Sequence, residues 1–166
     1  MKLKHSLSLK LKFLAIYQIL SAACGLFVII LFLLQNFMIS GQNILILLLM
    51  IMVHCIAIVA GLKLLRKKYK KGLILSCINQ CLQVLAFSVG SFEFMYFAGI
   101  KMFVQVGFYE NLEFTFGLRF LSQFNLHIFS NTGYYFSINL FAIFLLWFIA
   151  NVYDYLLKKN KTTPNS

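Results

Sequence analysis

The sequence predicts an all-α transmembrane four-helix bundle with a small extracytoplasmic antiparallel β insertion between its third and fourth helices. Three observations predict this fold class: the composition, four long apolar runs, and one aromatic stretch with a different periodicity. Of the 166 residues, 61% are hydrophobic and 11% are charged, and the mean hydropathy is +0.87. Soluble domains are about one-half apolar and one-quarter charged. The composition therefore indicates an integral membrane protein.

Four apolar runs account for the predicted helices. They cover residues 13–39, 44–65, 72–92 and 136–157. About 20 apolar residues are needed to cross a hydrocarbon core about 30 Å thick, and lipid cannot satisfy backbone polar groups, so each span is expected to be helical. The polar connection at 40–43 is so short that the first two helices should form an antiparallel hairpin.

The basic residues predict the orientation of these spans. Only Lys101 and Arg119 fall on one side, and thirteen fall on the other: Lys2, Lys4, Lys10, Lys12, Lys63, Arg66, Lys67, Lys68, Lys70, Lys71, Lys158, Lys159 and Lys161. Because cytoplasmic loops of membrane proteins carry the excess of Lys and Arg, both termini should be cytoplasmic, in a plasma membrane such as a bacterial inner membrane. A surface this basic should also attract anionic lipid headgroups, whereas nucleic acid is not an expected partner.

The chain is accordingly divided into three parts. Residues 1–92 hold the basic N-terminus and three helices, residues 93–135 form the extracytoplasmic insertion, and residues 136–166 hold the fourth helix and a basic tail. Residues 21–24, Ser-Ala-Ala-Cys, are similar to a lipoprotein cleavage site. The apolar run continues well beyond them, so we expect the first helix to be retained.

The insertion shows a period of two, which is typical of β-strands. Residues 112–120 and 102–108 alternate in this way, with 109–111 as a turn, and residues 124–128 suggest a third strand. An interfacial helix is the alternative. Residues 92–136 also hold fifteen of the 28 aromatic residues. A sheet of three strands cannot bury two faces by itself, so its apolar face should need a cover.

Four covers for that face are considered: the outer ends of the protein's own helices, the outer leaflet of the membrane, another copy of the chain, and a different protein. In the first interpretation, the face caps the protein's own helices. In the second, an exposed edge of the sheet binds a protein partner or another copy of the chain, and the candidate contact residues are Phe114, Phe116, Leu118 and Phe120. The second interpretation predicts an accessory or scaffold subunit that assembles with another membrane or periplasmic component.

A cluster of polar residues falls inside the predicted spans: His54, Gln83, Gln80, Asn79, Gln18 and Asn151. Polar groups are costly in hydrocarbon, so they should bond to one another between helices. Counting along the spans predicts one layer around His54 and Gln83, and another of Gln18, Asn79 and Asn151. Such layers fix helix register, or they line a site for a small or lipidic ligand, which is the alternative function. A histidine at mid-span can also relay protons.

Signatures of catalysis and cofactor binding are missing from the sequence. The cysteines, Cys24, Cys55, Cys77 and Cys81, all fall in predicted spans, where disulfides are not expected. Cys77 and Cys81 are four residues apart and share a helix face, so with His54 or Cys55 they could bind a soft metal ion. A role as small packing residues explains both cysteines equally well. No paired intramembrane acids, HExxH, GxSxG or phosphate-binding glycine loop occurs. A non-enzymatic protein without cofactor or metal is therefore expected.

Overall fold

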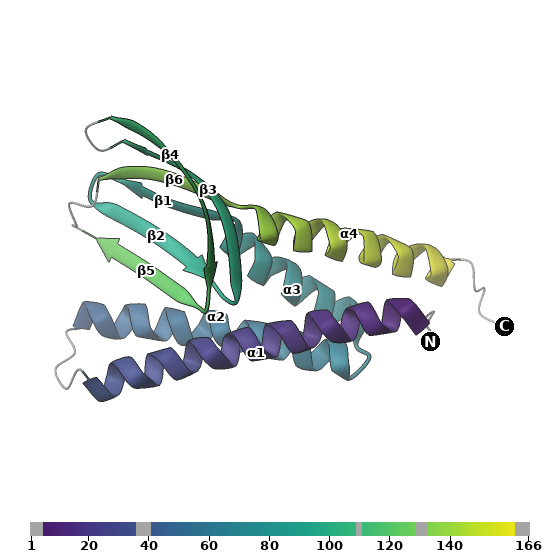
Figure 1. Cartoon of the computed structure of the whole chain (residues 1–166). Helices are drawn as coiled ribbons and strands as arrows, with labels where there is room; N and C mark the ends of the chain where they lie inside the picture. The colour runs from purple at the N-terminus through teal and green to yellow at the C-terminus, as the bar shows by residue number, and fades with distance from the viewer. Residues whose placement is uncertain (1–4, 36–40, 109–110, 129–132, 162–166) are drawn as a thin grey trace.

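The computed structural model describes residues 5–35, 41–108, 111–128 and 133–161, which form four helices and six strands (Figure 1). In chain order these are α1 (His5–Gln35), α2 (Gly41–Leu65), α3 (Tyr69–Val84), β1 (Leu85–Val89), β2 (Phe92–Phe97), β3 (Ile100–Phe108), β4 (Leu112–Phe120), β5 (Gln123–Ile128), β6 (Tyr134–Asn139) and α4 (Leu140–Lys161). The predicted turn at 109–111 lies largely outside the described residues.

Among the described residues, three helices are long and apolar enough to cross a membrane. Their apolar spans are Leu7–Leu34 in α1, Ile44–Leu65 in α2 and Leu140–Lys158 in α4. The third predicted span, 72–92, is wrong in its second half, because α3 has 16 residues and ends at Val84. Leu85–Val89 is a strand instead. An apolar run of this length does not by itself distinguish a helix from a strand.

The four-helix bundle is also wrong. Figure 1 shows α3 and α4 beside one half of the α1–α2 hairpin, which we call the proximal half (residues 5–20 and 55–65). The sheet lies beside the other half, the distal half (residues 21–35 and 41–54), near the connection between the two helices. A core of apolar side chains from α1, α3 and α4 fills the proximal half, including Leu11, Leu73 and Ile149.

The predicted small insertion is in fact a large six-stranded antiparallel sheet with the order β4-β3-β6-β1-β2-β5. It begins at Leu85, inside the predicted third helix, and ends at Asn139, inside the predicted fourth. The three predicted strands correspond to β3, β4 and β5. The third one does not continue a meander, however, because β5 pairs with β2 at the opposite edge from β4.

The sheet is strongly curled. Strands β4 and β5 lie at opposite edges of the sheet, yet only Leu121 and Ser122 connect them. The two edges therefore meet at this end, where Arg119 Nη1 lies 3.4 Å from Gln123 Oε1. Lys101 Nζ on β3 also reaches Met95 Sδ on β2 at 3.4 Å, although β6 and β1 separate these strands. The face that carries Lys101 and Arg119 is thus the concave face.

The two faces differ completely in chemistry. Strand pairing places the odd-numbered residues of β1 and the even-numbered residues of the other five strands on the convex face. Every one of them is aliphatic, methionine, phenylalanine or tyrosine. The concave face carries all the charged residues of the strands: Glu93, Lys101, Glu113 and Arg119.

The inner end of the sheet, where β2 turns into β3, is inserted between the helices. The Tyr17 hydroxyl on α1 donates to Ala98 O (3.0 Å) and accepts from Ile100 N–H (3.1 Å). Gln83 Oε1 on α3 accepts from Ala98 N–H (2.9 Å). Gly99 has φ +93°, and a Cβ there would lie 2.6 Å from the Tyr17 hydroxyl. This turn therefore requires glycine for both its backbone conformation and its close approach to α1.

Candidate functional site

The structure buries five of the six predicted intramembrane polar residues and separates the sixth. Gln18, His54, Asn79, Gln80 and Gln83 are almost inaccessible. Asn151 is exposed on α4, and its Nδ2 donates to the Trp147 carbonyl of the same helix (3.0 Å). The structure therefore does not bring Asn151 to Gln18 and Asn79.

The buried amides bond differently from the predicted interhelical layers. One bond joins two helices, from Ser76 Oγ to Gln18 Oε1 (3.0 Å). Asn79 Oδ1 instead accepts from the Tyr96 hydroxyl on β2 (3.0 Å), in the same way that Gln83 binds the Ala98 backbone. Helix α3 thus presents its amides to the sheet. The sequence did not reveal this role, because Tyr96 and Ala98, which bind these amides, fall in the insertion that was predicted to lie outside the membrane.

His54 is 1% exposed and lies at the centre of the α2 span. Its Nδ1 is 2.7 Å from the Met50 carbonyl. A carbonyl oxygen only accepts, so Nδ1 carries the proton and Nε2 of the neutral ring is an acceptor. Among the described residues, Nε2 has no hydrogen-bond partner. A Cβ at Gly25 would collide with this nitrogen, so the glycine leaves the room that it occupies.

A cleft of about 360 Å³ opens beside His54, between the distal half of the hairpin and β5. Its helix walls are formed by Gly25, Val28, Ile29 and Phe32 of α1 and by Ile46, Leu47, Met50 and His54 of α2. The opposite wall is formed by residues 122–127, in which Phe124 and Leu126 lie on the convex face and Gln123, Asn125 and His127 on the concave face. Gln80 and Gln83, which the sequence grouped with His54, do not line this cleft. The cleft is therefore mainly apolar on both walls, and His54 places a buried polar group beside it.

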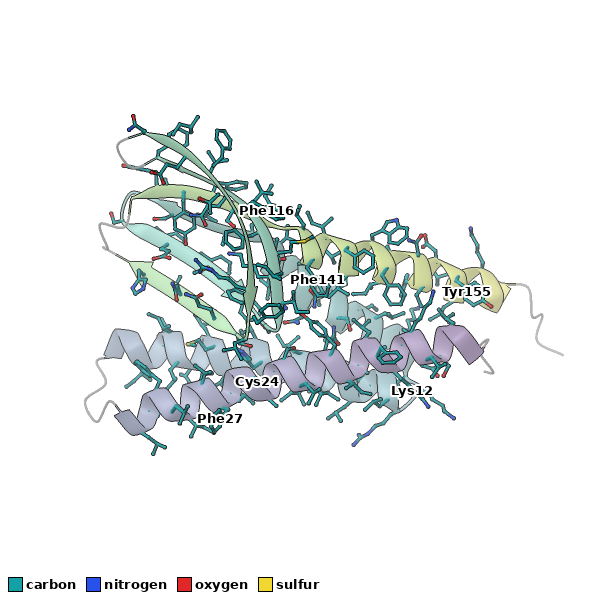
Figure 2. All side chains as sticks on the ribbon, in the orientation of Figure 1. Lys12, Cys24, Phe27, Phe116, Phe141 and Tyr155 are labelled. Atoms are coloured by element: carbon teal, nitrogen blue, oxygen red, sulfur yellow. The ribbon has the colours of Figure 1, made fainter. Side chains whose placement is uncertain are left out.

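The predicted partner-binding residues lie on the other edge of the sheet. Phe114, Phe116, Leu118 and Phe120 are 73%, 69%, 55% and 63% exposed on the convex face of β4. Every residue of this edge strand except Gly117 is exposed. Figure 2 shows Phe116 on the sheet, while Phe27 projects from α1 on the side of the hairpin away from the sheet.

The concave face holds a buried lysine that sequence reasoning missed. Lys101 is 3% exposed, and its Nζ lies 4.8 Å from the centre of the Phe103 ring, which also contacts Arg119 at 5.3 Å. No acidic side chain in the described part of the chain forms an ion pair with it. Burial, and secondly the charge of Arg119, lower the pKa of Lys101 from 10.5 to about 8. Glu93, on the same face, accepts from the Tyr135 hydroxyl (2.8 Å).

Lysines gather at the proximal end of the molecule. A cavity of about 460 Å³ lies there, lined by Lys63, Lys67, Lys68, Tyr69, Lys70, Lys71, Tyr153, Leu156 and Leu157. The expectation that anionic headgroups bind on this side stays a prediction. Among the residues that the structure describes, no group of three His, Cys, Asp or Glu side chains is placed to hold a metal ion.

Comparison with protein families, with curated proteins and with solved structures gives no match to this chain. The class of protein thus follows from its own structure: a protein with three helices that could span a membrane, combined with a six-stranded antiparallel sheet.

Proposed function

We propose that this protein is a membrane-embedded binding protein for an amphipathic, lipid-like ligand, held in the cleft between α1, α2 and β5. The observation that carries the proposal is the free Nε2 acceptor of His54, buried beside an apolar cleft. A buried polar atom without a partner costs about 1–3 kcal/mol. A hydroxyl or amide N–H of a bound ligand would remove this cost, since either group donates to Nε2.

The walls of the cleft define the chemical class of the ligand. Val28, Ile29 and Leu47 suit an apolar chain, and Phe124 and Leu126 of β5 continue this apolar surface on the opposite wall. The volume of about 360 Å³ is at the lower end of the about 300–1,000 Å³ of ligand sites, which favours a single chain. A long-chain alcohol or a monoacylglycerol combines these properties, and a bilayer around the hairpin would supply it.

Binding is favoured over catalysis by the residues that line the cleft. The described residues that line it include two imidazoles, His54 and His127, but no carboxylate. Glu93, the cross-strand neighbour of His127, accepts instead from the Tyr135 hydroxyl and from Asn125 Nδ2 on the concave face. The proposal therefore keeps the sequence-based view of a non-enzymatic protein.

The test uses the full-length protein in phosphatidylcholine nanodiscs and a long-chain alcohol that carries a diazirine in its chain. Photolabelled peptides should map to residues 25–54 and 122–127. His54→Leu should weaken binding about tenfold, the equivalent of about one hydrogen bond, and His54→Gln should weaken it less because it keeps an acceptor. Asn151→Leu, outside the cleft, is the matched control and should not change binding. Equal affinity of the wild type and His54→Leu would refute the proposal.

Assembly with another chain is a second candidate function, and a different observation favours it. Strand β4 is a nine-residue edge strand with exposed side chains, and no strand in the described part of the chain pairs with its outer side. Such an edge can accept a strand from a partner through backbone hydrogen bonds. The partner would be another membrane or periplasmic component, and the phenylalanines of β4 would contact it.

A further inference from the structure

We infer that the convex face of the sheet contacts lipid acyl chains, except where Tyr96 of β2 and Phe124 of β5 pack on α2. The sheet itself would then lie in the half of the bilayer that surrounds the distal half of the hairpin. This inference concerns the whole sheet and does not depend on a ligand in the cleft. It replaces the sequence-based picture of a domain that stands outside the membrane.

The depth of the sheet relative to the helices is the first argument. Ser122, between β4 and β5, donates to the carbonyl of Ser21, which is at the centre of the α1 span Leu7–Leu34. On β2, the Tyr96 ring packs edge-on against His54, the centre of the α2 span, with 5.7 Å between ring centres. The inner end of the sheet is thus at mid-span on both helices.

The length of the strands shows how far the sheet extends along the distal half of the hairpin. From Ser21 to Leu34, α1 advances about 20 Å at 1.5 Å per residue. Strands β2 and β5 have six residues each and cover about the same 20 Å. Figure 1 shows the sheet alongside the distal half of the hairpin rather than beyond it. If α1 and α2 cross a bilayer, most of the sheet is at the same depth as their distal half.

The arrangement of the two faces is the second and independent argument. A water-soluble barrel encloses its apolar side chains, whereas a membrane barrel turns them outward and keeps polar residues inside. This sheet follows the membrane pattern, because Glu93 and Lys101 are buried in the concave face while Phe114 and Phe116 are exposed on the convex face. If the sheet stood in water, its convex face would expose a contiguous apolar surface much larger than the patches that soluble proteins usually carry.

The convex surface continues the exposed apolar surfaces of the helices. Phe27 on α1, Leu48 on α2 and Trp147 on α4 are as exposed as Phe108 and Tyr134 on the sheet. A strand added to the β4 edge would cover only that edge and would leave β1, β3 and β6 uncovered. Lipid is the one occupant that covers all of these surfaces together. The backbone edge of β4 is the one surface that lipid does not suit, because hydrocarbon cannot satisfy its N–H and C=O groups.

The experiment uses tryptophan fluorescence in liposomes of phosphatidylcholine with brominated acyl chains, in a Trp147→Phe background. Phe116→Trp on β4 and Phe136→Trp on β6 place the probe on the convex face, and Thr115→Trp places it on the concave face as a matched control. Both convex probes should lose most of their fluorescence in brominated lipid and resist aqueous iodide. The concave probe should be quenched much less by brominated lipid.

Two results would overturn the inference. Iodide quenching of both convex probes, without quenching by brominated lipid, would place the sheet in water. Protection of both probes from either quencher would show that protein covers this face instead. Circular dichroism of each variant, matched to that of the parent, confirms that the sheet is folded in the sample compared.

Discussion

The core of the proximal half and the junction with the inner end of the sheet are held together in opposite ways. In the proximal half, helices α3 and α4 cover the hairpin through apolar side chains such as Leu14 and Leu73. At the inner end of the sheet, helix side chains bind the strands through hydrogen bonds, with Tyr17 on α1 and with Asn79 and Gln83 on α3. The difference follows from the backbone, because a helix satisfies its own N–H and C=O groups while a strand turn brings groups that need partners.

The largest effect should come from removing the polar group that serves two backbone partners. Tyr17→Phe leaves Ala98 O and Ile100 N–H without a partner in the interior, at a cost of about 1–3 kcal/mol for each group. Tyr153→Phe is the matched control in the proximal core, because its hydroxyl bonds to no group in the described part of the chain, and it should change stability by less than about 0.5 kcal/mol. Unfolding in mixed micelles with increasing dodecyl sulfate would measure both. Equal stabilities of the two variants would remove the distinction between the apolar core and the polar junction.

A second prediction concerns the concave face, where Lys101 is buried without an acidic partner. The pKa of Lys101 is lowered from 10.5 to about 8 on folding, so between these values the unfolded chain binds more protons than the folded one. Stability should therefore rise as pH increases through that window. Lys101→Met should remove this rise and should be the more stable protein below pH 8. Thermal unfolding in detergent from pH 7.5 to 10 measures the difference, and parallel profiles would contradict it.

Much of the helical part of this fold could be predicted from the sequence, and much of the sheet could not. The length and hydropathy of α1, α2 and α4 identify them as spans. The sequence predicts a helix over residues 85–89 because they continue the apolar run 72–92. Within them, however, Leu85, Phe87 and Val89 alternate with the smaller Ala86 and Ser88. This alternation was the available signal for β1, and it was too short to outweigh the run.

The position of β5 could not be predicted in the same way. A connection of two residues, Leu121 and Ser122, normally joins neighbouring strands in a hairpin. Here it joins opposite edges because the sheet curls until they meet. The curl is a property of long-range packing, and it also decides that Lys101 and Glu93 are interior. For the same reason the sequence predicts only a polar cluster around His54, and it does not predict that Gln80 and Gln83 stay outside the lining of the cleft.

A third prediction compares an exposed strand with an exposed helix. The double substitution Phe114→Ser and Phe116→Ser should leave the free energy of unfolding within about 1 kcal/mol of wild type, because both rings are exposed and make little contact within the chain. If β4 is an assembly edge, partners recovered from gently solubilised membranes should be lost with this variant. Phe27→Ser, on the exposed side of α1, is the matched control and should retain them. Retention by both variants would argue against assembly through β4.

The smallest effect should come from the one predicted cluster residue that the structure places apart. In the described part of the chain, Asn151 donates only to the Trp147 carbonyl, which is a backbone acceptor of the same helix. The Asn151 side chain is also exposed. Asn151→Leu should therefore change stability by less than about 0.5 kcal/mol, whereas Gln83→Leu, which leaves Ala98 N–H unpaired, should cost about 1–3 kcal/mol. Both are amide-to-leucine changes in long apolar segments, so their difference isolates what the amide contacts. If Asn151→Leu proved as costly as Gln83→Leu, the polarity of these helices would reflect contacts between helices, and the sheet would no longer explain it.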